Sequence, residues 1–143
     1  MARLHYGINV SVDGYIEDAR GGFDWTEPND EVFGFITDFM RAHRTYLYGR
    51  RLYEVMRYWD EDHPEWGADE REFAAAWRSQ PKWVVSRSLK SVGPNTTLVA
   101  DDVEAAIRGL KDDLAGEIQV GGPELAASLT DTCLLYTSDA ADE

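Results

Sequence analysis

Three short segments combine glycine, serine and arginine in a way that suits the binding of a phosphorylated ligand. They are LYGRR at 47–51, VVSRS at 84–88 and QVGGPE at 119–124. Glycine lets backbone amides approach an anion closely, and arginine supplies a planar donor that fits phosphate. Taken singly, each segment could be an ordinary turn with solvated side chains. QVGGPE matches neither the spaced glycines of a dinucleotide fingerprint nor a P-loop.

Apolar runs typical of strands precede these segments, and helical patterns alternate with the strands through most of the chain. This alternation predicts an α/β fold in one domain, with a mainly parallel central sheet between two layers of helices. Ligands bind such sheets at the carboxyl ends of the strands. The expected strands are 4–12, 44–49, 82–88, 96–100 and 117–120, and the expected helices begin near 29, 50, 69, 101 and 123.

Two helices carry more specific signals. In the first, Asn29 or Asp30 is expected to cap the start, and an apolar stripe is expected to face the core. In the fourth, Asp101 and Glu104 form a capping-box pattern. The stripe of the first helix consists of Val32, Phe35, Ile36, Phe39 and Met40.

Composition excludes several classes of function. The chain has 143 residues, with 27 acidic against 14 basic side chains and a net charge of −13, so it should repel nucleic acid and anionic membranes. No apolar run approaches the roughly 20 residues of a spanning helix, and no signal-peptide pattern is present, which favours the cytoplasm. A single cysteine and three scattered histidines predict neither a disulfide nor a metal site.

The segments INVSVDGYIED, GGFDW, TYLYGRRLYEVM, WVVSRSL and IQVGGPELAASL, in this order from residue 3 to about 131, resemble the dihydrofolate reductase-like superfamily. They are most similar to bacterial proteins that share the RibD C-terminal domain of riboflavin biosynthesis. The resemblance implies an NADPH-dependent reductase and, for intact relatives, a homodimer. Its substrate would be a small pterin-like or pyrimidine heterocycle, as for dihydrofolate reductase or 5-amino-6-(5-phosphoribosylamino)uracil reductase.

The resemblance also implies a set of NADPH-binding residues and a Gly-Gly turn that in many members contains a cis peptide. Carried over position by position, the cofactor-binding residues are Gly49, Arg50, Ser86, Arg87, Gly121, Gly122, Glu124 and Leu125. Arg50 and Arg87 would favour NADPH over NADH.

A catalytic acid stands at the start of the first long helix in pterin-reducing members, shortly after a tryptophan, and Asp30 aligns with it. Asp30 equally suits a helix N-terminus, where the dipole favours a carboxylate. Phe33, or Phe35 or Phe39, could stack on a flat substrate or belong to the core. The expected substrate-binding residues are Asn9, Asp13, Trp25 and Phe33. The alternative function is a non-catalytic nucleotide-binding protein.

The resemblance stops after residues 130–132. The remaining residues, CLLYTSDAADE at 133–143, resemble the translation of a transposase-end adapter from sequencing libraries. We therefore expect residues 1–132 to be an incomplete domain that lacks its C-terminal strands, and 133–143 to be a non-native tail; a short acidic terminus is the alternative. Such a truncation would leave an open sheet edge and could make the fragment inactive and prone to aggregation.

Overall fold

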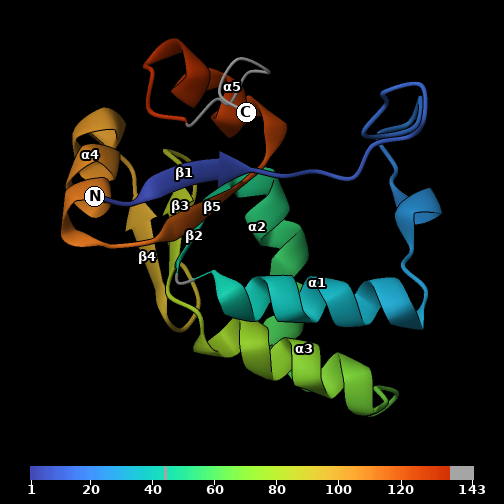
Figure 1. Cartoon of the computed structure of the whole chain (residues 1–143). Helices are drawn as coiled ribbons and strands as arrows, with labels where there is room; N and C mark the ends of the chain where they lie inside the picture. Colours follow the sequence, from blue (N-terminus) through green and yellow to red (C-terminus); the bar gives the residue numbers. More distant parts are fainter. Residues whose placement is uncertain (44, 136–143) are drawn as a thin grey trace.

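A computed structural model describes residues 1–43 and 45–135 (Figure 1). Its centre is a parallel sheet in the order β1-β5-β2-β3-β4. The strands are β1 (Arg3–Tyr6), β2 (Thr45–Gly49), β3 (Lys82–Val85), β4 (Thr96–Val99) and β5 (Glu117–Gly121). None of the helices in this part of the chain is long and apolar enough to cross a membrane.

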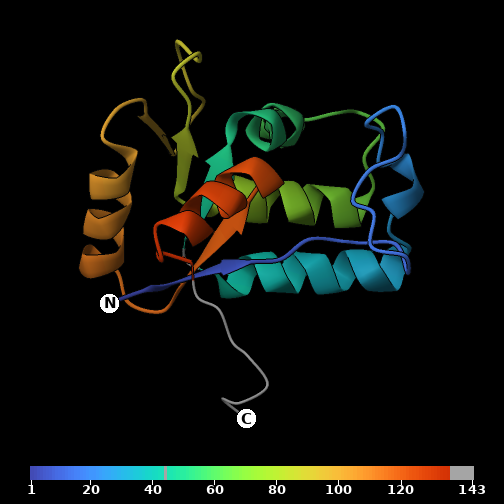
Figure 2. The ribbon, with the colours of Figure 1, turned by 90° about the horizontal axis from the view of Figure 1, so that it is seen from above.

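Helices cover both faces of this sheet. They are α1 (Asp30–Ala42), α2 (Arg50–Met56), α3 (Ala68–Ser79), α4 (Val103–Asp113) and α5 (Pro123–Asp131), with short 3-10 turns η1 (Asp24–Thr26) and η2 (Arg57–Asp60). On one face Leu47 and Val120 pack with Ile107 of α4 and Leu129 of α5. On the other, α1 and α3 lie side by side, as Figures 1 and 2 show. The predicted three-layer α/β fold is therefore confirmed.

β1 is shorter than expected. The sequence predicts a strand from Leu4 to Val12, but β1 ends at Tyr6, which pairs with Val120 of β5. β5 turns into α5 after Gly121, so the backbone beyond Tyr6 has no strand beside it. The side chains of Val10 and Val12 are consequently exposed.

α1 begins where the sequence predicts, because the Asn29 side-chain oxygen accepts a hydrogen bond from the Val32 amide at 2.9 Å. Its buried face differs from the prediction. The ring centroid of Phe33 lies 5.4 Å from that of Phe73 in α3, and Met40 is buried on the same side. Because α1 packs against α3 through Phe33 and Met40, Val32, Phe35 and Phe39 lie off the buried face and keep 44%, 67% and 38% of their surface exposed.

The capping box predicted for α4 is wrong. The N-cap residue is Asp102, in a left-handed conformation with φ 47° and without a side-chain capping hydrogen bond. Glu104 instead accepts from Arg108 one turn later, at 2.7 Å. The side-chain pair within the helix thus uses the carboxylate that the capping box would need.

The region expected to be a non-native tail begins inside the described part of the chain. Leu134 is buried in the core next to α4 and α5, and Lys111 donates a hydrogen bond from Nζ to its carbonyl at 3.0 Å. Leu135 forms a parallel bridge with Leu4 of β1. Residues 136–143 of that expected tail lie outside the described residues.

Candidate functional site

A cavity of about 640 Å³ lies at the carboxyl ends of β1, β5 and β2. Its walls come from three parts of the chain: the segment after β1, the turn from β2 into α2, and the turn from β5 into α5. The loop at 16–26 closes a fourth side. The lining includes Tyr6 to Asn9, Gly49 to Leu52, Gly122 to Leu125, and Ile16, Glu17, Gly21, Phe23, Thr26 and Val55.

The two strand-end turns touch through their glycines. A Cβ placed on Gly122 would stand 3.6 Å from the amide nitrogen of Gly49 and 3.7 Å from its Cα. Gly122 has φ 108° and ψ 124°, a conformation that residues with a side chain rarely adopt. Without side chains the two turns can approach each other closely, and both glycines line the cavity where α5 starts.

Gly121 has a different role from Gly122. A Cβ at this position would lie 2.6 Å from Tyr48 Cδ1 and 2.7 Å from Leu52 Cδ2, so the glycine makes room for protein side chains. Within the described residues no peptide bond is cis, and the turn expected to contain one is trans.

The cationic side chains of the cavity already carry carboxylate partners. Arg50 donates from Nη1 to Glu54 at 2.9 Å, and Arg51 Nη1 lies 3.4 Å from Glu124 Oε1. The second pair is highly exposed, with 77% and 81% of the two side chains accessible. An exposed ion pair contributes only about 0–1 kcal/mol, so an incoming phosphate can displace Glu124 at little cost.

Ser86 and Arg87 stand apart from this cavity, one strand farther along the sheet at the end of β3. The Ser86 hydroxyl oxygen accepts hydrogen bonds from the amides of Ser88 and Leu89, at 3.2 and 3.1 Å. Arg87 lines a separate shallow hollow with the start of α4, including Asp102. The structure thus leaves Ser86, Arg87 and Gly121 outside the cavity lining. The predicted cofactor residues that line it are Gly49, Arg50, Gly122, Glu124 and Leu125.

The predicted substrate residues also separate. Asn9 lines the cavity. Asp13 accepts a hydrogen bond from Ser11 in its own turn at 2.6 Å, and Trp25 is exposed on η1. Phe33 packs against Trp59 and Phe73 in the core. Asp30, the predicted acid, is exposed in the first turn of α1 and does not line the cavity.

From the loop at 16–26 the sequence predicted Trp25 as a substrate residue, but not the residues of this loop that line the cavity. Asp18 organises this loop, because its carboxylate accepts hydrogen bonds from the amides of Arg20 and Gly22 at 2.7 and 2.8 Å. These bonds, Gly22 first, lower the pKa of the Asp18 carboxyl. The signal for such a compact turn is DARGG, an aspartate followed by two glycines.

Comparison with known proteins shows one similar sequence and two similar structures among those described below. No protein-family profile matches it. An uncharacterized protein of Bacillus subtilis strain 168, YyaP, is 29% identical over 122 residues, which are 84% of this chain. The matched region covers 62% of the length of YyaP, so the chain spans less than two thirds of this relative.

Two solved structures share the fold. A Shewanella sp. PV-4 protein named for riboflavin biosynthesis superposes with a TM-score of 0.66 at 24% identity, covering 94% of this chain and 72% of that protein. A Thermotoga maritima diaminohydroxyphosphoribosylaminopyrimidine deaminase/5-amino-6-(5-phosphoribosylamino)uracil reductase superposes with a TM-score of 0.57 at 16% identity, covering 92% and 42% of the two chains. The chain therefore has the α/β fold found in these two proteins.

Proposed function

We propose that this chain belongs to the dihydrofolate reductase-like superfamily and forms the cofactor-binding part of an NADPH-dependent reductase. Its substrate would be a pterin-like or pyrimidine heterocycle. The observation that supports this proposal is the cavity in which the bare backbones of Gly49 and Gly122 meet beside Arg50 and Arg51. The fold shared with a uracil reductase agrees with it.

The residues present fit a dinucleotide. The backbone of Gly49 and Gly122, which we call the cradle, is suited to a pyrophosphate, because a pyrophosphate needs backbone amides within hydrogen-bond reach. A Cβ at Gly122 would narrow this cradle. Arg51 can exchange Glu124 for a phosphate oxygen, and Arg50 can do the same with Glu54. When bound, NADPH supplies the hydride; the protein orients the two reactants and excludes water.

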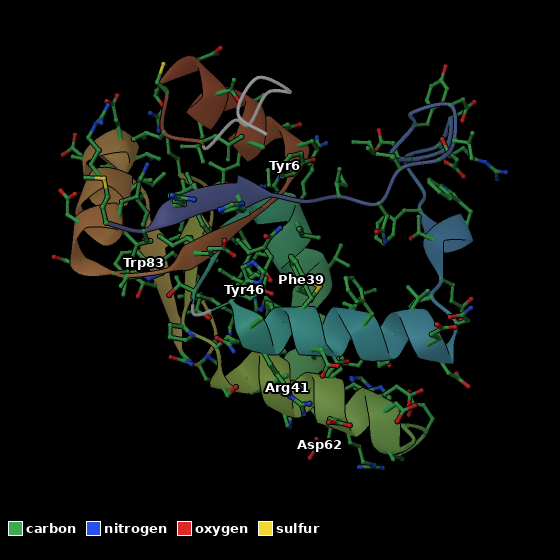
Figure 3. The ribbon with its side chains drawn as sticks, in the orientation of Figure 1. Tyr6, Phe39, Arg41, Tyr46, Asp62 and Trp83 are labelled. Atoms are coloured by element: carbon green, nitrogen blue, oxygen red, sulfur yellow. The ribbon has the colours of Figure 1, made fainter. Side chains whose placement is uncertain are left out.

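The part of the cavity that would hold the substrate has apolar side chains, as a flat heterocycle requires. Ile8 and Val55 line the cavity, and both have partly exposed side chains. In Figures 1 and 2 the segment after β1 runs parallel to the axis of α1, and Phe35 and Phe39 on this helix are partly exposed. Figure 3 shows Phe39 between α1 and the sheet, on the side of Tyr46. Neither ring lines the cavity, so either would stack on a heterocycle only if the substrate extended beyond the cavity toward α1.

A second candidate function is nucleotide binding without reduction. The exposed position of Asp30, away from the cavity lining, favours it, because a proton donor must reach the reacting ring. In this candidate the cofactor cavity is kept and no group supplies the proton.

Binding and turnover experiments separate the two candidates. Calorimetric titration of the 143-residue chain with NADPH should give saturable one-site binding under either proposal. NADPH oxidation with dihydrofolate, or with the uracil reductase substrate, should occur only for a reductase, and loss of this turnover in Asp30→Asn would identify Asp30 as the acid. Binding without turnover on either substrate supports the second candidate, and absence of NADPH binding rejects both.

A further inference from the structure

Glu124 lies where a carboxylate opposes the binding of a phosphate. It belongs to the first turn of α5, and its Oε1 is 3.4 Å from Nη1 of Arg51 in the first turn of α2. Both residues line the cavity. The ion pair therefore connects the two turns that form the cradle, where the proposed function places a pyrophosphate.

The charges on the cavity wall cancel. Two arginines and two glutamates line it, and these are Glu17, Arg50, Arg51 and Glu124. Arg50 in addition donates a hydrogen bond to Glu54, one turn along α2. An incoming anion thus meets no excess of positive side-chain charge, and the net charge of −13 on the whole chain adds to the repulsion.

The pair between Arg51 and Glu124 can open when a ligand arrives, because both side chains are highly exposed and such pairs contribute little to stability. A phosphate that takes Arg51 leaves the Glu124 carboxylate beside the phosphate oxygens and without its cation. Like charges in this position repel each other. The repulsion is offset only if hydrogen-bond donors reach the carboxylate, since an ionised carboxylate accepts hydrogen bonds and donates none.

A nucleotide brings such donors and a free anion does not. The sugar hydroxyl groups of a dinucleotide are joined to its pyrophosphate, and hydrogen bonds from hydroxyl groups to a carboxylate are strengthened by its charge. Inorganic pyrophosphate carries negative charge without hydroxyl groups on a sugar. The Glu124 carboxylate would therefore gain partners from a nucleotide and only repulsion from pyrophosphate.

We infer that Glu124 is a specificity-determining residue that admits a nucleotide to the cavity and disfavours free pyrophosphate, and this inference rests on the proposed NADPH-binding function. On binding, Arg51 exchanges the Glu124 carboxylate for a phosphate oxygen, and Glu124 accepts hydrogen bonds from ribose hydroxyl groups. Glu124 thus adds little to the affinity for NADPH itself, because repulsion and new hydrogen bonds offset each other. It sets the ratio between the affinities for the two ligands.

Calorimetric titration of the 143-residue chain with NADPH, and competition of inorganic pyrophosphate against bound NADPH, test this in the wild type and in Glu124→Gln. Glutamine keeps the size of the side chain and removes its charge. The affinity of the variant for pyrophosphate should rise roughly five-fold, the equivalent of about 1 kcal/mol, because no carboxylate remains beside the anion. Its affinity for NADPH should not rise, since the ribose hydroxyl groups lose a charged acceptor. The NADPH to pyrophosphate affinity ratio should therefore fall.

Glu31→Gln is the matched control. Glu31 is the second residue of α1, as Glu124 is the second residue of α5, and both side chains are exposed. Glu31 does not line the cavity. The control variant has the same change in net charge and at a helix N-terminus, and it should leave the affinity ratio unchanged.

An unchanged ratio in Glu124→Gln, including an equal gain of affinity for both ligands, would mean that Glu124 does not distinguish a nucleotide from a free anion, and it would overturn the inference. Failure of pyrophosphate to compete with NADPH in either protein would overturn it too. In these cases NADPH still binds and the proposed function stands. Absence of NADPH binding to the wild type rejects the proposed function, and the inference with it.

Discussion

Gly122 lies so close to Gly49, although 73 positions apart, that a Cβ added to Gly122 would be 3.6 Å from the Gly49 amide nitrogen, in van der Waals contact. β2 and β5 are hydrogen-bonded neighbours, with Tyr48 paired to Gly121, so their carboxyl ends turn into helices side by side. The turn at Gly122 has a backbone conformation that favours glycine, and the turn at Gly49 packs against it. The site's geometry thus depends on the backbone of two turns more than on any side chain.

Gly122→Ala should weaken both stability and cofactor binding. Its φ of 108° is unfavourable for alanine, and such strain costs about 1–3 kcal/mol. The new methyl group would also occupy the cradle beside Gly49. We expect the free energy of unfolding in urea to fall by that amount and the NADPH affinity to fall by roughly ten-fold or more.

Gly116→Ala is the control for this strain. Gly116 also has a positive φ, 95°, but an added Cβ meets nothing within 4 Å, and the residue precedes β5 at its opposite end. Its free energy of unfolding should fall comparably with no change in NADPH affinity. Equal losses of affinity in the two variants would show that the cradle is not where the cofactor binds.

Sequence patterns were sufficient to predict the fold because each helix and strand has its own pattern of apolar and capping residues. Alternating apolar runs located the strands, and Asn29 marked the start of α1. The extent of β1 could not be predicted, since a strand continues only while a neighbour pairs with it. The buried face of α1 was ambiguous for a similar reason: Phe33, Phe35 and Phe39 lie on two overlapping faces, and only the position of α3 selects between them.

The candidate site was predictable where it depends on sheet topology. The rule that strands of a parallel sheet end at one edge brings Gly49 and Gly122 together. The same rule cannot say which strand ends are neighbours, so it grouped Ser86 with them although β3 lies beyond β2.

Arg50 and Arg87 should affect different parts of a dinucleotide. Arg50 lines the main cavity, beside the glycine turns, where a pyrophosphate common to NADPH and NADH would lie. Arg87 is one strand farther away, where the extra phosphate of NADPH could reach. Arg50→Ala should therefore weaken both cofactors, whereas Arg87→Ala should lower the NADPH to NADH affinity ratio roughly ten-fold, about 1.4 kcal/mol.

Arg108→Ala serves as the comparison for Arg87, because Arg108 lines the same hollow but is hydrogen-bonded to Glu104 at 2.7 Å. It should leave the ratio of the two dissociation constants unchanged. If Arg50→Ala and Arg87→Ala both leave that ratio unchanged, the assignment of NADPH as the preferred cofactor is wrong.

Lys82 should make the fold more stable as pH rises from about 8 to 10. The side chain is 1% exposed, with Nζ donating to the carbonyls of Trp77 and Gln80 at 2.8 and 2.9 Å. Burial lowers its pKa from 10.5 to about 8, against the opposing effect of Asp60. Between these values the unfolded chain binds more protons than the folded one, so the free energy of unfolding increases with pH. The increase should be roughly 2 kcal/mol over this range.

Urea unfolding at several pH values between 8 and 10 measures this, with Lys82→Met as the test variant and the exposed Lys90→Met as the control for lost charge. The range ends at 10 because burial raises the pKa values of Tyr46 and Tyr48, and these phenols destabilise the fold once the unfolded tyrosines ionise. In Lys90→Met the free energy of unfolding should still increase with pH, and in Lys82→Met this increase should be lost. The loss of two hydrogen bonds can change the overall stability of Lys82→Met without affecting this comparison. An equal increase of the free energy of unfolding with pH in both variants would mean that Lys82 is charged in the folded protein throughout this range.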